Sequence, residues 1–441
     1  MIKIVKFGGS SVANSEQFKK VKEIVLSDDS RRFVVISASG KGKNADNKIT
    51  DLLFLCHAHL EYNISCDNIF NMIVERFVNI KKELNLKYDI EKELDLIKSQ
   101  LDKKIDLHYL ASRGEYLTSN LMAEYLGYTF IDAKDLIFFK YDGSIDYEKI
   151  NLALSEIIKT QSKLVIPGFY GALPNGKIKI MSRGGGDVTG SIMANVVNAD
   201  VYENWTDVSG IMTADPRIIK NPKHIDAITY SELRELSYMG ASVLHEEAVF
   251  PVKEKNIPIH ILNTNKPDDE GTYIFDKCED KDPNNIITGI AGKKDFSIIT
   301  IKKNQMYNKL ATMKDVLDIL GKYKINVEHI PTGVDSISVI ADCSKVSSHI
   351  FEVLMEIKTV CNADDVYVID NIALIATVGR NMKKRSGISG RLFGALGKND
   401  INIYAISQTS EEINIIIGVS NNDYENTIKA IYNEFVDKEK I

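Results

Sequence analysis

Two glycine-rich stretches carry residue types that could hold an anion and move a phosphoryl group. Lys6 opens KFGGSS (6–11), and SRGGGDVTGS (182–191) places three glycines between Arg183 and Asp187. Glycines let backbone amides approach anionic oxygens, and a helix N-terminus adds positive potential. A phosphate loop usually carries its own lysine, which the second stretch lacks. Because Lys6 lies at the end of a predicted strand, we expect it to supply that cation from the other end of the domain.

Both stretches also have a purely structural interpretation. KFGGSS could be a plain strand-to-helix turn with a solvated lysine, and SRGGGD could be a hairpin in which Arg183 pairs with Asp187. A dinucleotide-binding loop fits poorly, because neither glycine cluster has GxGxxG spacing after the first strand. The planar guanidinium of Arg183 otherwise suits a carboxylate or a phosphate.

Polar residues also follow a third strand and open a helix. In TDVSGIMTADPR (206–217), Thr206 and Asp207 suit a ribose or a nucleobase edge, and Arg217 suits nucleotide phosphates. In SRGE (112–115), Glu115 falls in the first turn of a predicted helix. Taken alone, the first segment is typical of an Asp-rich turn and Glu115 of a capping charge. Glu115 binds substrate only if the substrate carries a cationic group.

The elements that must position these residues follow a strand–turn–helix rhythm. Residues 1–55 have the spacing of a βαβ unit, which favours a parallel sheet with loops gathered at the strand carboxyl ends. Between 56 and 127, apolar residues recur every three or four positions, as from Ile90 to Ile105, which predicts a helical insertion. The strand rhythm resumes from 128 to about 290.

The C-terminal part contains an internal repeat. DILGKYKINVEHI (318–330) aligns with GALGKNDINIYAI (394–406) at an offset of 76 residues, and ISVI (337–340) falls on INII (413–416) at the same offset. Each copy is too small to be stable alone, so we expect the two to bury their sheets and helices together. The polar segment DKDPNN (280–285) predicts a boundary before the repeat.

Composition narrows the class of partner. The chain has 441 residues and 55 Lys and Arg against 61 Asp and Glu, a formal charge of −6, which favours small-molecule substrates and no nucleic acid. Its 5 cysteines are scattered without a CxxC or a His cluster, which indicates free thiols and no protein-bound metal site. No apolar run approaches the ~20 residues of a membrane span, and MIKIVKFGG leaves no room for a targeting peptide. We therefore expect a cytoplasmic protein with no membrane partner.

Taken together, the motifs resemble those of the aspartate kinases in the amino-acid-kinase superfamily. KFGGSSV, SASGKGKNADNKITDLL, SRGE, SRGGGDVTGS, TDVSG with TADPR, and GASVLHEEAV occur in the family's order, and the repeat looks like the family's paired ACT regulatory modules. The resemblance implies a monofunctional enzyme without a homoserine dehydrogenase extension. It implies a three-layer α/β/α kinase domain with a mainly parallel sheet over 1–285, including the helical insertion at about 56–127. Two ferredoxin-like βαββαβ ACT modules would follow at 286–370 and 371–441.

The resemblance also implies a reaction and a role for each matched residue. Aspartate kinases transfer the γ-phosphoryl group of ATP, which Mg²⁺ accompanies, to the side-chain carboxylate of L-aspartate, the first step of lysine, threonine and methionine biosynthesis. A carboxylate is already ionised at neutral pH, so the site needs no general base and must hold two anions together. The catalytic pair is Lys6 and Asp187. The substrate-binding residues are Ser37, Thr50, Glu115 and Arg183. The nucleotide-binding residues are Lys6, Gly8, Gly9, Ser10, Gly184, Gly185, Thr206, Asp207, Asp215, Arg217 and Ser242.

Three positions depart from the family pattern. Relatives usually have Ser or Thr at Gly186, Tyr at Met212 and Lys at Ser242, so this chain lacks two hydroxyls and one cation near the expected site. The residues that could replace the cation are Lys41, Lys43 and Lys223.

The ACT modules imply feedback inhibition by an amino acid, with lysine as the leading candidate and threonine as the alternative. The matched effector residues are Met306, Thr312, Glu328 and Asp335. The carboxylates of the last two suit an amino group, although a solvated loop charge would look the same. ACT sheets usually pair between chains, so we expect a homodimer or a tetramer.

Two other functions remain open. A weakly active or non-catalytic amino-acid-binding regulatory paralogue would fit the three departures, and a kinase for another small acid would share the fold. Retention of Lys6, Glu115, Arg183 and Asp187 favours an active aspartate kinase.

Overall fold

The computed structural model describes residues 1–42, 47–182, 184–241, 244, 246–278, 285–304, 309–383 and 385–437. The chain divides into two compact units, and each is described by itself. The first comprises Met1–Ile211, Ile225–Tyr230 and Val243–Cys278, and the second Met212–His224, Ser231–Ser242 and Glu279–Ile441. In these described ranges, no helix has both the length and the apolar character needed to cross a membrane.

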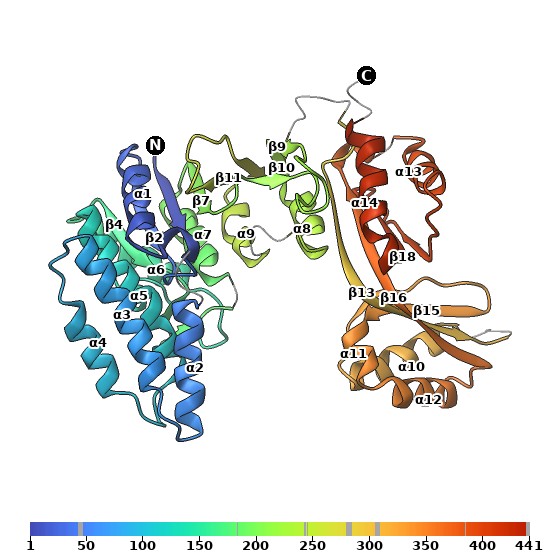
Figure 1. Ribbon diagram of the computed structural model, residues 1–441, viewed down its shortest axis with the longest axis horizontal. Helices are drawn as coiled ribbons and strands as arrows, with labels where there is room; N and C mark the ends of the chain where they lie inside the picture. The colour runs from blue at the N-terminus through green and yellow to red at the C-terminus, as the bar shows by residue number, and fades with distance from the viewer. Residues whose placement is uncertain are drawn as a thin grey trace. The chain divides into compact units, whose positions relative to one another are not determined.

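The first unit is a three-layer α/β/α domain built on an eight-stranded sheet in the order β10-β12-β11-β7-β1-β2-β4-β3 (Figure 1). Neighbouring strands are parallel except β11 and β12, which are antiparallel. The strands are β1 (Lys3–Phe7), β2 (Arg31–Ile36), β3 (Thr129–Phe130), β4 (Leu164–Pro167), β7 (Val201–Thr206), β10 (Ala227–Thr229), β11 (Ile259–Asn263) and β12 (Thr272–Phe275). A separate hairpin pairs β5 (Tyr170–Ala172) with β6 (Ile178–Ile180).

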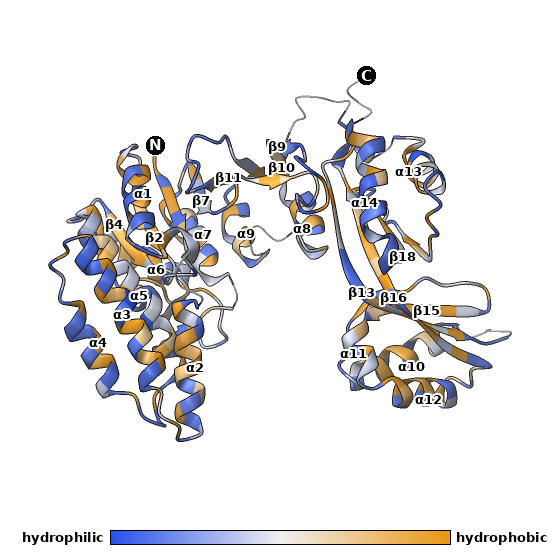
Figure 2. Ribbon diagram, in the orientation of Figure 1, coloured by the Kyte–Doolittle hydropathy of each residue, from blue (hydrophilic) through white to orange (hydrophobic). Residues whose placement is uncertain are grey.

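Helices cover both faces of this sheet. The first face packs its apolar core against α1 (Ser15–Leu26), α2 (Ile49–Glu61), α3 (Asp67–Glu83), α4 (Ile90–Ser99) and α5 (Leu107–Leu126). The opposite face carries α7 (Gly185–Val197), with α6 (Tyr147–Ile157) and α9 (Val249–Lys253) beside it. Figure 2 shows hydrophobic residues along β4 and bands of both kinds on α2, α3 and α4, as amphipathic helices on a buried sheet require.

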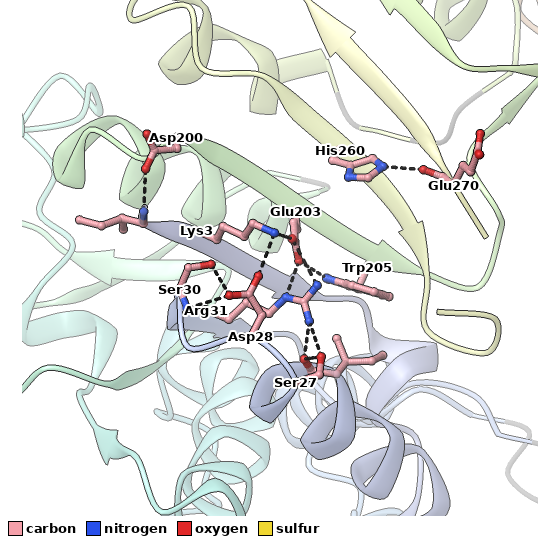
Figure 3. A network of polar contacts seen from close by, with 12 residues as sticks. Lys3, Ser27, Asp28, Ser30, Arg31, Asp200, Glu203, Trp205, His260 and Glu270 are labelled. Carbon is pink, nitrogen blue, oxygen red and sulfur yellow. Dashed lines mark hydrogen bonds and ion pairs between the residues drawn. The ribbon is translucent and has the colours of Figure 1, made fainter. Parts of the chain in front are cut away.

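Buried charges brace the central strands on the α1 face. Glu203 of β7 is only 2% exposed, and it binds Lys3 Nζ at 2.9 Å and Arg31 Nε at 2.9 Å (Figure 3). Asp28 also binds Lys3, at 3.0 Å, and the indole N–H of Trp205 donates to Glu203 at 2.9 Å. A buried carboxylate is tolerated because these donors satisfy it. The network ties β1, β2 and β7 together.

The second unit contains a six-stranded antiparallel sheet in the order β14-β15-β13-β16-β18-β17 (Figure 1). Its strands are β13 (Gly289–Lys302), β14 (Val327–His329), β15 (Ser336–Asp342), β16 (Asp365–Val378), β17 (Ala405–Ser407) and β18 (Asn414–Ser420). Its helices are α8 (Tyr230–Tyr238, from its second residue), α10 (Lys309–Lys322), α11 (Cys343–Ser347), α12 (Ile350–Val360), α13 (Ile388–Gly397) and α14 (Tyr424–Tyr432). The short strands β8 (Ile211–Met212) and β9 (His224–Ile225) span sequence boundaries between the units.

The two long strands β13 and β16 are shared between two modules. The second half of β13 pairs with β15 and the first half of β16 over a core closed by α10 and α12. The first half of β13, Gly289–Lys293, pairs with the second half of β16 over a core closed by α13 and α14. The pairing shifts between the halves, where Asp295 (φ 69°) and Asn371 (φ 60°) adopt left-handed backbone conformations.

The internal repeat occupies equivalent elements of these modules. The segments α10, β14 and β15 of the first correspond to α13, β17 and β18 of the second. The left-handed residues that follow the helices, Lys324 (φ 57°) and Asp400 (φ 55°), fall at the repeat offset. Each module therefore has the strand order of a ferredoxin-like βαββαβ fold. The second module takes its fourth strand from the segment that precedes the first.

Candidate active site

Four parallel strands end at one edge of the first unit's sheet, where the sequence motifs meet. Lys6 is the penultimate residue of β1, Ser37 and Gly168 directly follow β2 and β4, and Thr206 ends β7. The carboxyl edge of an open parallel sheet is where such folds bind ligands. The register of the strands therefore brings together residues that are far apart in the sequence.

Lys6 and Asp187 form a buried ion pair at this edge. Lys6 Nζ lies 2.6 Å from Asp187 Oδ1, and the two side chains are 10% and 14% exposed. Asp187 stands in the first turn of α7, whose N-cap is Gly184 in the left-handed conformation (φ 76°). Glycine has no side chain to cap this turn, so the Gly185 and Gly186 N–H groups suit an anion, whereas the Asp187 N–H already donates to the Gly184 carbonyl at 2.8 Å. Arg183, the alternative partner considered from the sequence, lies outside the described residues.

Asn204 of β7 reaches the same carboxylate, and the sequence did not single it out. Its Nδ2 donates to Asp187 Oδ1 at 2.8 Å. The only signal in the sequence is a polar residue inside the strand VYENWT. In the pairing of β1 with β7, Asn204 is the partner of Lys6, so the two side chains lie next to each other on one face of the sheet.

The glycines of KFGGSS let the first loop interlock with the loop after β2. Gly40 N–H donates to the Gly9 carbonyl at 2.9 Å, and Gly8 N–H donates to the Trp205 carbonyl at 3.0 Å. A Cβ on Gly9 would lie 2.9 Å from the carbonyl oxygen of Ala38, and one on Gly40 only 2.5 Å from the Gly9 carbonyl carbon. Neither position can take a side chain without moving backbone. Ser10 belongs to the short 3₁₀ helix Gly9–Val12 that follows.

The departure at Gly186 has a packing explanation. A Cβ at this position would lie 2.8 Å from Ser37 Oγ and 3.4 Å from Lys6 Cε. Glycine therefore leaves the space beside Lys6 to the Ser37 hydroxyl, which a serine or threonine at 186 would displace. Met212, the second departure, is half-buried on β8, and Ser242 lies outside the described residues.

Glu115 is a buried carboxyl group in the middle of α5, not in the first turn of a helix as the sequence suggested, and within the described ranges it has no cationic partner at hydrogen-bond distance. It is 5% exposed, and its Oε2 has no hydrogen-bond partner among the residues that the structure describes. Burial raises the pKa of Glu115 from its ordinary 4.5 to about 8, although the Ala38 amide hydrogen-bonds the carboxyl and partly opposes the shift. Gly114 allows this approach, because a Cβ there would lie 2.9 Å from Ala38 Cβ. A substrate ammonium group would satisfy Glu115.

The other predicted substrate residues lie around the same loop. The hydroxyl of Thr118 on α5 accepts the Ser39 N–H at 3.2 Å, and the Ser39 carbonyl accepts the Ile49 N–H at 3.0 Å. Thr50 follows Ile49 in the first turn of α2. The loop after β2 is thus held between α2 and α5, with Ser37 at its start.

The predicted nucleotide residues divide between the two units. In the first, Gly184 and Gly185 begin α7, while Thr206 ends β7 and its hydroxyl donates to Asp207 Oδ1 at 3.2 Å. In the second, Arg217 forms a close pair with Asp215, with Nη2 2.6 Å from Oδ2 and the Arg217 side chain 88% exposed. Thr206 ends the strand that carries Asn204, and Asp207 directly follows it. Asp215 and Arg217 pair with each other, as in the Asp-rich turn that was the structural alternative from the sequence.

Family models and a curated relative match this architecture. Residues 1–263 match the model of the amino acid kinase family, and residues 375–435 match the model of an ACT domain. Aspartokinase 3 of Bacillus subtilis is 35% identical to this chain, with 98% of each chain covered. The chain belongs to the aspartokinases of the amino acid kinase family. It is therefore a kinase, an enzyme that transfers phosphoryl groups.

Solved structures resemble this aspartokinase along nearly the whole chain. The aspartate kinase of Clostridium acetobutylicum is 49% identical with a TM-score of 0.93, covering 98% of this chain and 100% of that one. Aspartokinase III of E. coli is 25% identical, with TM-scores of 0.77 for its complex with aspartate and ADP (R-state) and 0.79 for its complex with lysine and aspartate (T-state). The two matches cover 98% and 99% of this chain and 99% of each E. coli chain.

The predicted effector residues of this aspartokinase lie in the second unit. Glu328 on β14 accepts a hydrogen bond from the Tyr238 hydroxyl of α8. Thr312 is buried in α10, and Asp335 is exposed in the loop before β15. Met306 lies outside the described residues. Beside Glu328, His329 lines a cavity of about 230 Å³, and its buried Nε2 has no hydrogen-bond partner in the described part of the chain.

Proposed function

We propose that this aspartokinase transfers the γ-phosphoryl group of ATP to the side-chain carboxylate of L-aspartate, giving 4-phospho-L-aspartate. The product would enter lysine, threonine and methionine biosynthesis. The observation that carries the proposal is the buried pair of Lys6 and Asp187 beside the N-terminus of α7. The E. coli relative with aspartate and ADP bound supports the choice of substrates.

The reaction needs charge neutralisation rather than a base. One oxygen of the aspartate side-chain carboxylate forms a bond to the γ-phosphorus, the bond from that phosphorus to the β,γ-bridging oxygen breaks, and ADP leaves with the electron pair. Negative charge gathers where two anions meet. The Lys6 ammonium and the N–H groups of Gly185 and Gly186 at the start of α7 would stabilise it. Asp187 keeps Lys6 in position.

Glu115 and Arg183 would select the amino acid. The α-ammonium of aspartate would be the partner of Glu115 Oε2, which has none in the described part of the chain. Because the pKa of Glu115 is about 8, the carboxyl must lose a proton when it accepts the ammonium at neutral pH. The resemblance assigns an aspartate carboxylate to Arg183, with Ser37 and Thr50 lining the pocket.

Mg²⁺ would arrive with ATP. Among the described residues, no group of three or more His, Cys, Asp and Glu side chains could hold a metal ion. Mg²⁺ commonly binds through substrate phosphate oxygens and water with one or two carboxylates, so we expect the nucleotide to carry the ion. When bound, Mg²⁺ would neutralise phosphate charge. The nucleotide would lie along Gly8, Gly9, Ser10, Gly184, Gly185, Thr206 and Asp207, with Asp215, Arg217 and Ser242 completing the set by resemblance.

An amino acid, most simply lysine, would inhibit through the second unit, with threonine as the alternative. The E. coli relative with lysine bound supports this choice. We place the first ACT module around 286–370 and the second around 371–441, with β13 and β16 contributing to both. Glu328 has a carboxylate suited to an effector ammonium, and its bond to Tyr238 would have to yield to that ammonium. A homodimer or tetramer through these modules is part of the proposal.

A hydroxamate assay tests the proposal. The purified protein receives ATP, Mg²⁺, L-aspartate and hydroxylamine, which traps an acyl phosphate, with and without lysine or threonine. We expect aspartate-dependent hydroxamate that lysine suppresses. No hydroxamate, together with amino-acid binding by calorimetry, would instead support the non-catalytic regulatory paralogue. Hydroxamate formed only from another acid would support a kinase for another small acid.

A further inference from the structure

Asn204 is a buried polar side chain at a central strand position. It is 2% exposed and lies on β7 between Glu203 and Trp205, which point to the opposite face of the sheet. A buried amide without a partner destabilises a fold, so such a side chain must be hydrogen-bonded. Its Nδ2 donates to Asp187 Oδ1 at 2.8 Å.

The acceptor is the same oxygen that binds Lys6. Lys6 Nζ lies 2.6 Å from Asp187 Oδ1, and the pairing of β1 with β7 aligns Lys6 with Asn204. Two residues earlier on the same face of β7, the Tyr202 hydroxyl donates to the main-chain carbonyl of Asp187 at 3.1 Å. One strand therefore holds Asp187 by both its carboxylate and its backbone.

The opposite face of β7 makes Asn204 a fixed donor. Glu203 binds Lys3 of β1 and Arg31 of β2 there (Figure 3), so the strand is anchored to its neighbour β1 and to the strand beyond it. A carboxylate on a free side chain can rotate about its Cβ–Cγ bond and offer either oxygen to a cation. A second, immobile donor on Oδ1 removes that freedom from Asp187.

We infer that Asn204 is a positioning residue for phosphoryl transfer, which fixes the Asp187 carboxylate so that Lys6 stays directed at the transferring group. This inference rests on the proposed function. Asn204 acts through Asp187 and binds neither substrate in the proposed mechanism. Its loss should therefore lower turnover while leaving substrate binding nearly unchanged.

Two substitutions test this role. Asn204→Ala should lower kcat in the hydroxamate assay about tenfold to 100-fold, as expected for losing a hydrogen bond to a charged group, with KM for aspartate and ATP nearly unchanged. Asn204→Asp places a second carboxyl group beside Asp187. Two carboxyl groups at such a short distance do not both ionise readily, because their negative charges repel. Its protonated form can donate to Oδ1 as the amide does.

The pH profile of Asn204→Asp separates positioning from mere structure. The charged or titratable groups around position 204 are Lys6 on β1, Asp187 on α7 and the Tyr202 hydroxyl on β7. The kcat of this variant, low at pH 8, should recover toward the wild-type value as the pH falls to 6. A deficit independent of pH would overturn the inference.

Asn195→Ala is the matched control. Asn195 is buried on the same helix as Asp187, and its Nδ2 donates to the Pro251 carbonyl at 2.6 Å, so the variant loses a comparable hydrogen bond away from Lys6. Its kcat should stay within about twofold of wild type. A loss equal to that of Asn204→Ala would mean that both variants act through the fold alone.

A second readout does not depend on turnover. Acetylation of Lys6 by an N-hydroxysuccinimide ester, quantified by mass spectrometry, should be severalfold faster in Asn204→Ala than in the wild type or Asn195→Ala, because Lys6 loses a fixed partner. Wild-type protein without hydroxamate would contradict the proposed function, yet faster acetylation would still support the Asn204 contact. Unchanged acetylation with unchanged kcat would overturn the inference.

Discussion

Replacing Glu115 with glutamine should stabilise the substrate-free enzyme, and the gain should grow as the pH rises. Burial raises the pKa of Glu115 from 4.5 to about 8, so the folded chain disfavours the ionised carboxyl. Below pH 4.5 the carboxyl is protonated in both the folded and the unfolded chain, so it costs no folding free energy. As the pH rises from 4.5 to about 8, the unfolded chain loses this proton first, and the free energy of unfolding falls progressively. Glutamine carries no charge and avoids that loss, while its Oε1 can still accept the Ala38 N–H.

The magnitude follows from linkage. At 1.36 kcal/mol per pKa unit, ionisable Glu115 costs about 3 kcal/mol of folding free energy at pH 7 and about 4 kcal/mol at pH 8, against less than about 1 kcal/mol at pH 5. Urea unfolding followed by tryptophan fluorescence measures this cost in the first unit. The chain has 1 Trp, Trp205, which is buried there.

Glu124, a second carboxylate on the helix that carries Glu115, provides the control. Glu124→Gln changes a half-buried carboxylate on the same helix and keeps an acceptor for one of the two N–H groups, of Lys87 at 2.6 Å and Tyr88 at 2.8 Å, that Glu124 accepts. The difference in unfolding free energy between Glu124→Gln and the wild type should not grow between pH 5 and 8. If the stability difference between wild type and Glu115→Gln were constant from pH 5 to 8, the burial argument would be wrong. Calorimetry in two buffers should also detect proton release when aspartate binds the wild type at pH 7.

Three further substitutions probe other parts of the molecule. Lys6→Ala should lower kcat by orders of magnitude while circular dichroism stays that of the folded chain; near-normal turnover would remove Lys6 from its proposed role. Glu203→Gln should destabilise the first unit by about 3–5 kcal/mol in urea, because two half-buried cations lose the buried carboxylate that they share. A change below about 1 kcal/mol would show that the network is dispensable. Glu328→Ala should relieve lysine inhibition of hydroxamate formation without changing the uninhibited rate, whereas intact inhibition would place the effector elsewhere.

Local sequence patterns predicted the turns and the strand ends but not the contacts across the sheet. KFGGSS and SRGGGD indicated two anion-binding loops because glycine has a local conformational meaning. The pairing of Lys6 with Asp187 was an expectation taken from resemblance, since only the packing of α7 against β1 places the two side chains 2.6 Å apart. Asn204 was missed for the same reason. Its role exists only where β1, β7 and α7 meet.

The regulatory half shows a second kind of limit. The repeat offset correctly related α10 to α13 and β15 to β18. A repeat read along the sequence nevertheless suggests modules that follow one another, whereas β13 and β16 each serve both. The bulges that separate the two halves of β13 and β16 lie at Asp295 and Asn371, which have left-handed backbone conformations. No local periodicity in the sequence marks these two residues.

This sharing of strands determines how the chain can be cut. A fragment beginning at 371 would keep most of β16 and all of β18 and lose Gly289–Lys293, leaving the second half of β16 with a bare row of amide and carbonyl groups. Such an open edge recruits a strand from another copy, so the fragment should swap or aggregate. Exchange of regulatory regions between aspartokinases should therefore need the whole stretch from 285 onward as one piece, together with Met212–His224 and Ser231–Ser242 of the same compact unit.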